Sequence, residues 1–210
     1  MSAAFRTLNT QQLQLLAPDV AQAAAVADFY RRNAEHFAPW DPPLPPDHTA
    51  PEVVERALAD GAEAFATGRA LRWWLTLADD PPASALRVIG SVHLSGIVRG
   101  AFQSCNLGYA LDAACQGRGL MHEALGAAIA EAFSPRVNLH RLQAAWRPEN
   151  RRSGAVLQRL GFEDEGLARD YLFIDGAWRD HRLAALRNPG FRPPGDWPAS
   201  TAAAGSVPRD

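Results

Sequence analysis

The chain has 210 residues, of which 47% are hydrophobic and 21% are charged, and its formal net charge at pH 7 is -2. This length suits one well-buried core and is too short for two full-sized domains. A net charge near zero gives no overall basic field to attract nucleic acid, and no run of about 18 apolar residues is available to span a membrane. We therefore expect a cytoplasmic protein that binds neither nucleic acid directly nor a membrane.

The residues that could hold a metal ion are sparse. Cys105 and Cys115 have the spacing of neither a metal knuckle nor a redox pair, and the six histidines form no His-x-x-x-His or Cys/His cluster. We expect reduced thiols and no metal site.

The first third of the chain predicts one strand followed by helices. Residues 13–16 suit a short strand, and Asp19 stands where a helix cap would, ahead of an alanine-rich helix over residues 20–36. Six prolines between residues 37 and 51 then favour an extended loop, and a second helix is expected over residues 52–67.

The remaining elements predict an antiparallel meander followed by mixed structure. Strand-like segments occupy residues 71–78, 88–98 and 106–111, after which apolar residues recur at helical spacing from Gly119 to Phe133. A strand, a helix and two more strands are expected over 140–146, 151–160, the region near Leu172, and 182–186. This order predicts an α+β arrangement, not a doubly wound sheet. We expect one domain over residues 1–187 and a poorly ordered Pro/Ala/Gly-rich tail over residues 188–210.

The segment Gln116-Gly117-Arg118-Gly119-Leu120-Met121 joins a predicted strand to a predicted helix. Its glycines allow a close backbone approach to a ligand, and the helix N-terminus offers N–H groups suited to a diphosphate. A tight strand-to-helix turn is the alternative explanation. The segment fits neither a dinucleotide fingerprint, because His122 stands where glycine or alanine is needed, nor a P-loop, because the chain has no lysine.

This segment resembles the acetyl-CoA loop of the GCN5-related N-acetyltransferases (GNAT), in which Gln or Arg, two residues and Gly precede one residue and a Gly or Ala. Gln116 and Gly119 match, and Met121 departs in the way that resembles the Rim-type enzymes, the ribosomal-protein-alanine N-acetyltransferases. Further segments that resemble this branch are His36-Phe37-Ala38-Pro39-Trp40, Leu107-Gly108-Tyr109, Pro148 to Ser153, Leu160-Gly161-Phe162 and Asp175 to His181.

The resemblance implies a fold and an activity. The fold would be a mixed, mostly antiparallel twisted sheet of about seven strands, splayed at the acetyl-CoA site, with helices on both faces. The activity would be transfer of acetyl from acetyl-CoA to the N-terminal α-amine of a protein, such as a ribosomal protein beginning with Ala or Ser. A small-molecule amine acetyltransferase and an inactive CoA-binding sensor are the alternatives, and the chain is expected to be a monomer or a homodimer.

The resemblance also implies roles for individual residues in binding acetyl-CoA. Backbone N–H groups from Gly117 to Met121 would hold the diphosphate with added charge from Arg118, and Asn150, a predicted helix N-cap, would contact the CoA arm. The expected cofactor-binding residues are Leu107, Gly108, Tyr109, Gln116, Gly117, Arg118, Gly119, Leu120, Met121, Asn150 and Ser153.

The resemblance implies Ser153 near the thioester sulfur, where its hydroxyl would protonate the leaving thiolate, and Tyr171 is the competing acid. The strand before the glycine loop carries no carboxylate, so Glu165 and Asp170 are the nearest candidates for the base. Glu165 is taken as the catalytic residue and Asp170 as an acceptor contact. An α-amine, with a pKa of about 7.7 to 8.0, needs only a weak base. Trp40 and Asn106 complete the expected acceptor-binding residues.

Overall fold

The computed structural model describes residues 7–79, 86–195 and 197, and these form an α+β fold around one eight-stranded sheet. Neighbouring strands are antiparallel except for the parallel pair β5–β6. In sheet order the strands are β1 (Leu8–Asn9), β2 (Leu13–Leu16), β3 (Leu71–Leu77), β4 (Gly90–Val98), β5 (Ser104–Leu111), β6 (Arg141–Trp146), β8 (Ala177–Arg187) and β7 (Glu163–Ile174). The predicted fold class is confirmed, with the two-residue β1 as a strand that the sequence did not indicate.

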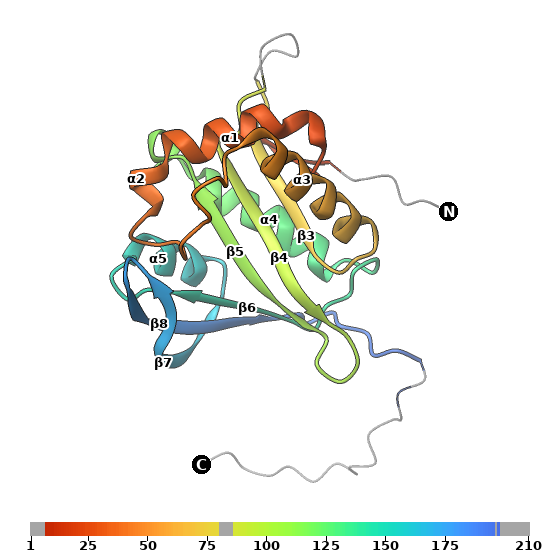
Figure 1. Ribbon diagram of the computed structural model, residues 1–210. Coiled ribbons are helices and arrows are strands. Elements are labelled where there is room, and N and C mark those ends of the chain that lie inside the picture. Colours follow the sequence, from red (N-terminus) through yellow and green to blue (C-terminus); the bar gives the residue numbers. More distant parts are fainter. Residues whose placement is uncertain (1–6, 80–85, 196, 198–210) are drawn as a thin grey trace, which may run out of the picture.

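Helices cover both faces of the sheet, as expected (Figure 1). The 3-10 turn η1 (Val20–Gln22), α1 (Ala23–Arg32), α2 (Ala34–Phe37) and α3 (Pro51–Ala66) come before β3, and η2 (Ala113–Cys115), α4 (Leu120–Phe133) and α5 (Arg151–Arg159) follow β5. Because adjacent strand residues face opposite sides, Trp73 and Trp74 belong to different buried clusters. Trp74 packs in the cluster with α1 and α3, and Trp73 in the cluster with α4.

The prediction of one continuous helix over residues 20–36 is wrong, because the helix is interrupted at Asn33. The Asn33 side chain is buried, its Nδ2 donates to the Phe29 carbonyl at 2.9 Å, and its Oδ1 accepts from the N–H of Ala113 at 3.0 Å. The side chain therefore ties the end of α1 to the segment that follows β5. The predicted cap at the start is confirmed, since Asp19 accepts from the N–H of Ala21.

The C-terminal strands form a long hairpin, β7–β8, turned by Asp175 and Gly176, which both have positive φ. After β8, Asn188 is buried and donates from its side chain to the Leu139 carbonyl at 2.9 Å, and the ring centroid of Phe191 lies 5.1 Å from that of His140. The first residues of the expected tail thus contact the sheet. Residues 196 and 198–210 of that tail lie outside the described residues.

Candidate active site

The sheet opens between its two parallel strands. The ladder between β5 and β6 ends at the pair Leu107 and Ala144, yet β5 continues to Leu111 beside β4 and β6 continues to Trp146 beside β8. The strands diverge beyond this pair, as Figure 1 shows. The expected splay is therefore present.

Gly108 stands at the first position beyond the split. A Cβ at this residue would lie 2.3 Å from Nε2 of His93 on β4, so the close approach of that ring requires glycine. His93 is half-buried, and its desolvation, together with the charge of Arg72, lowers the pKa of its imidazole to about 4, which keeps the ring neutral against the sheet.

The glycine loop leads from η2 into α4 with the geometry of an anion site. Gly117 and Gly119 have φ of +76° and +77°, a region that favours glycine, and a Cβ at either would meet no atom within 4 Å. The first hydrogen bond of α4 runs from the N–H of Glu123 to the carbonyl of Gly119, so the N–H groups of residues 120–122 remain directed out of the helix end. Such N–H groups suit a diphosphate.

The start of α5 forms the other side of the split. Asn150 caps this helix by accepting from the N–H of Ser153 at 3.1 Å, which confirms the predicted N-cap. The Ser153 hydroxyl lies 2.8 Å from the hydroxyl of Tyr109 on β5. Burial is the main cause that raises the pKa of Tyr109 to about 12, so this phenol stays protonated at neutral pH. The two hydroxyls therefore link the diverging elements.

A third wall comes from α2 and the loop after it. Nε2 of His36 lies 2.9 Å from Nε2 of Gln116 in the glycine loop, and Oε1 of the same Gln116 accepts from Arg152 of α5. Gln116 thereby connects α2, the glycine loop and α5 through its single side chain.

These walls enclose a cavity of about 880 Å³. Nine of the residues predicted from the sequence line it together: Trp40, Tyr109, Gln116, Gly117, Gly119, Leu120, Met121, Asn150 and Ser153. Leu107 is buried at the last pair before the split, and the exposed Arg118 is absent from the lining. The glycine backbone, the free helix end and the split fit an elongated molecule that carries a diphosphate at one end.

Besides Leu107, Gly108 and Arg118, four predicted residues are absent from this lining. Glu165, on β7, forms an ion pair with Arg141, and the exposed ring of Tyr171 lies 5.4 Å from the ring of His181. Asp170 has a positive φ and its N–H donates to the carboxylate of Asp180, while Asn106 is exposed on β5 before the split. The structure does not bring these side chains to the cavity, because the β7–β8 register holds the first three on the hairpin.

Asp41, which was not among the residues predicted from the sequence, lines the cavity next to Trp40. Burial raises the pKa of its carboxyl to about 6. The only sequence signal was its place after the His36 to Trp40 segment. His36 was named there only as part of that segment, without a role, and it too lines the cavity.

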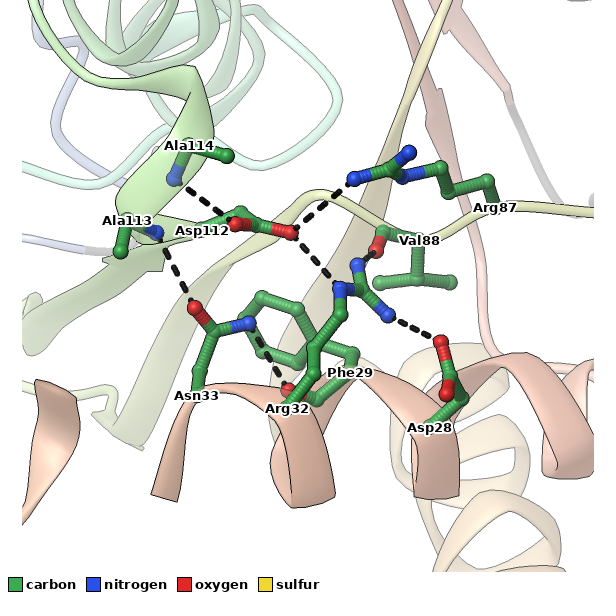
Figure 2. Close-up of polar contacts among 9 residues, drawn as sticks. All are labelled: Asp28, Phe29, Arg32, Asn33, Arg87, Val88, Asp112, Ala113 and Ala114. Atoms are coloured by element: carbon green, nitrogen blue, oxygen red, sulfur yellow. Dashed lines mark hydrogen bonds and ion pairs between the residues drawn. The ribbon is translucent and has the colours of Figure 1, made fainter. Parts of the chain in front are cut away.

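A buried carboxylate holds the segment that leads into the glycine loop. Figure 2 shows Asp112 between Arg32 and Arg87, with Oδ2 at 2.8 Å from Nε of Arg32 and 3.8 Å from Arg87. Its Oδ1 accepts from the N–H of Ala114 at 2.9 Å. Burial raises the pKa of Asp112, but the bonds from Arg32 and Ala114 outweigh it and hold the pKa below its usual value. With Asn33, these contacts form a bracket that fixes the loop to α1.

Two structural features are absent from the described ranges 7–79, 86–195 and 197. No helix there combines the length and the apolar character needed to cross a membrane. Within the same ranges, no three His, Cys, Asp or Glu side chains gather in a way that could hold a metal ion.

Comparisons with known proteins agree with this geometry. Residues 12–163 match the acetyltransferase (GNAT) domain family. The chain is 39% identical over 186 residues to the [ribosomal protein uS5]-alanine N-acetyltransferase of Escherichia coli (strain K12), covering 89% of this chain and 93% of that protein.

Solved structures give the same result. The ribosomal-protein-S5-alanine acetyltransferase of Vibrio fischeri superposes with a TM-score of 0.84 at 32% identity, over 90% of this chain and 100% of that one. Mycobacterium smegmatis RimJ in complex with CoA-disulfide superposes with a TM-score of 0.74 at 32% identity, over 83% and 81% of the two chains. The split sheet, the glycine loop and these matches agree, and the chain belongs to the GNAT acetyltransferase family.

Proposed function

We propose that this protein transfers the acetyl group of acetyl-CoA to the N-terminal α-amine of a ribosomal protein that begins with alanine. The observation that supports this most strongly is the single cavity that joins the glycine loop to the Tyr109–Ser153 hydroxyl pair at the sheet split. A diphosphate at one end and a thioester at the other match this arrangement. The alanine acceptor comes from the similarity to the Escherichia coli enzyme over most of both chains.

The cofactor end works through backbone groups. The N–H groups at the start of α4 and in the Gly117–Gly119 loop bind the diphosphate, and the pantetheine arm lies in the split with its thioester near Ser153. Along β5, alternate residues bond to β4, as the N–H of Asp112 does to the Ile89 carbonyl, so Tyr109 and Leu111 face the split. Beyond Leu107 these two residues have no partner in β6, and the N–H of Tyr109 is available to the carbonyl oxygen of the thioester.

The transfer needs a donor for the leaving sulfur. The neutral amine attacks the thioester carbonyl, and the thiolate leaves as the C–S bond breaks. The Ser153 hydroxyl donates to that sulfur and is resupplied by Tyr109, whose high pKa keeps it protonated. This pair takes the role that the sequence had assigned to Ser153 or to Tyr171.

Free-thiol release from acetyl-CoA tests the function with a set of matched peptides. One begins with a free alanine, one with a free serine, and one carries an acetylated N-terminus and an internal lysine. We expect release with the alanine peptide, less with the serine peptide, and none with the blocked peptide, because the lysine ammonium has a pKa of about 10.4 and stays protonated.

Other outcomes would change the assignment. Reaction of the blocked peptide would contradict α-amine selectivity, and acetyl-CoA binding by calorimetry without reaction of any peptide would contradict a protein acceptor. Small amines would then be tested in the same assay.

A further inference from the structure

A tight turn after the C-terminal end of α2 fixes the backbone of Asp41. Its N–H donates to the carbonyl of Phe37 at 2.9 Å, and the N–H of Trp40 donates to the same carbonyl at 2.7 Å. Phe37 is buried in the cluster formed with α1 and α3. The position of Asp41 is therefore tied to the hydrophobic core.

A second anchor reaches this turn from the other side of the split. Arg147, directly after β6, donates to the Pro39 carbonyl, and its guanidinium carbon lies 5.5 Å from the centre of the Trp40 ring. The same arginine lies 3.4 Å from Glu149. The loop that carries Asp41 is thus held against the strand that forms one edge of the split.

The Asp41 carboxylate faces the cavity without a partner. Among the described residues, no side chain donates a hydrogen bond to it, and burial is the cause of its raised pKa. A half-buried carboxylate that accepts no hydrogen bond has lost part of its hydration, which is unfavourable in free energy. An ammonium group that enters the cavity would compensate for this loss by pairing with the carboxylate. The other charged or titratable residues that line the same cavity are His36, Tyr109, His122, Glu149, Arg151, Arg152 and Arg159.

We propose that Asp41 is the catalytic base of this acetyl transfer: it binds the α-ammonium of the acceptor and removes one of its protons. This proposal rests on the proposed function, because it needs an amine acceptor. It supplies the base that neither the strand before the glycine loop nor the exposed Glu165 provides.

The acceptor nitrogen loses two protons during the transfer. The acceptor enters as an ammonium and gives its first proton to Asp41, which later releases it to solvent. The neutral nitrogen then forms the C–N bond, and the C–S bond breaks as Ser153 gives a proton to the thiolate. The second proton leaves the nitrogen to solvent water, and the Ser153–Tyr109 pair regains one proton from solvent water, so both hydroxyls are restored. The products are the acetylated amine, the free thiol and one proton.

The affinity of the carboxylate for protons suits this step. A free α-ammonium has a pKa of about 7.7 to 8.0, roughly two units above the raised pKa of Asp41. An unperturbed aspartate, at about 3.9, would be a far weaker acceptor of that proton.

The pH dependence of kcat/KM with the alanine peptide tests the proposal. For the unchanged protein we expect kcat/KM to rise around pH 6 and level off near pH 7. Asp41→Asn should lower kcat/KM at pH 7 by about 10²- to 10³-fold and move the rise to about pH 8, where the amine loses its own proton. Calorimetry should give the same acetyl-CoA Kd within about threefold, which shows that the variant folds.

Control variants separate Asp41 from its neighbours. Asp47→Asn, in the same loop but exposed, should leave both the rate and the pH midpoint unchanged. Histidines titrate in the same range, so His36→Asn is measured in parallel. A midpoint that stays near pH 6 in Asp41→Asn, or that moves only in His36→Asn, overturns the proposal.

The two proposals fail in different ways. An unchanged protein that acetylates no peptide refutes the proposed function and the base with it. Normal acetylation by the unchanged protein, with Asp41→Asn equally active or raised only in KM, refutes the base alone.

Discussion

Two regions of the molecule use arginine–carboxylate contacts in opposite environments. In the bracket before the glycine loop, the Asp112 side chain is 4% exposed and Arg32 is 24% exposed. In the β7–β8 hairpin, the members of the pair Arg182–Asp164 are 40% and 44% exposed, and those of Arg187–Glu163 are 60% and 69% exposed. The same residue types therefore hold the cofactor loop firmly but contribute little to the hairpin.

The difference separates two tasks. The loop must present backbone N–H groups in a fixed position, and a buried, fully bonded carboxylate provides that rigidity. The hairpin is ordered by its backbone ladder, so its exposed charges are free to vary. This contrast implies losses that fall from about 3 kcal/mol at the buried bracket to near zero at an exposed pair.

Removing the carboxylate of the bracket should have the largest effect. Asp112→Ala leaves the partly buried Arg32 without its main partner, and we expect a loss of about 3 kcal/mol in the free energy of unfolding, measured in urea. The matched hairpin variant, Asp164→Ala, should lose less than about 1 kcal/mol. Equal losses in the two variants would contradict the contrast.

Removing the hydroxyl next to the bracketed loop should affect catalysis rather than stability. Ser153→Ala is expected to lower kcat about 10²-fold, close to 2.7 kcal/mol, because the leaving sulfur loses its donor. Tyr171→Phe on the hairpin is the control and should keep the unchanged kcat. If kcat fell further in Tyr171→Phe than in Ser153→Ala, Tyr171 and not Ser153 would be the general acid.

The bracket should also show in acid unfolding. The folded-state pKa of Asp112 lies below its usual value, so its carboxylate stabilises the fold above about pH 4, and that stability is lost as pH falls through the folded pKa. The stability difference between the unchanged protein and Asp112→Asn, of about 1 to 2 kcal/mol at pH 7, should shrink below pH 4. A difference that stays constant down to pH 2 would exclude this linkage.

The glycine loop gives a smaller effect that depends on backbone conformation. Gly119→Ala places a side chain at φ of +77° with no clash, so we expect about 1 kcal/mol of strain and a roughly fivefold higher acetyl-CoA Kd. Gly126→Ala, inside α4 with open space around it, should instead stabilise by about 0.5 kcal/mol. If both variants changed the free energy of unfolding in the same direction, the positive φ of Gly119 would carry no strain energy.

The smallest effect belongs to the ion pair between Arg141 of β6 and Glu165 of the hairpin. Glu165→Gln should change the free energy of unfolding by less than about 0.5 kcal/mol, and that change should vanish in 1 M salt. Activity should be unchanged. A loss of kcat would restore Glu165 as a candidate base.

The sequence predicted the features that depend on neighbouring residues. The glycine loop, the helix after it and the Asn150 cap follow from local patterns within a few positions. The break at Asn33, the Tyr109–Ser153 pair and the place of Asp41 depend on contacts between distant segments, which no local pattern encodes. Tyr171 and Glu165 were assigned by their position along the chain, whereas the hairpin register decides where they lie.

The end of the β5–β6 ladder leaves an unpaired strand edge inside the sheet, where an edge is normally a template for another chain. A pantetheine arm in the split would act as a short substitute strand on this edge. The amide hydrogens of Tyr109 and Leu111, which face this edge, should then exchange more slowly with deuterium when CoA is bound. Mass spectrometry of that exchange would read the occupancy of the cavity without any turnover.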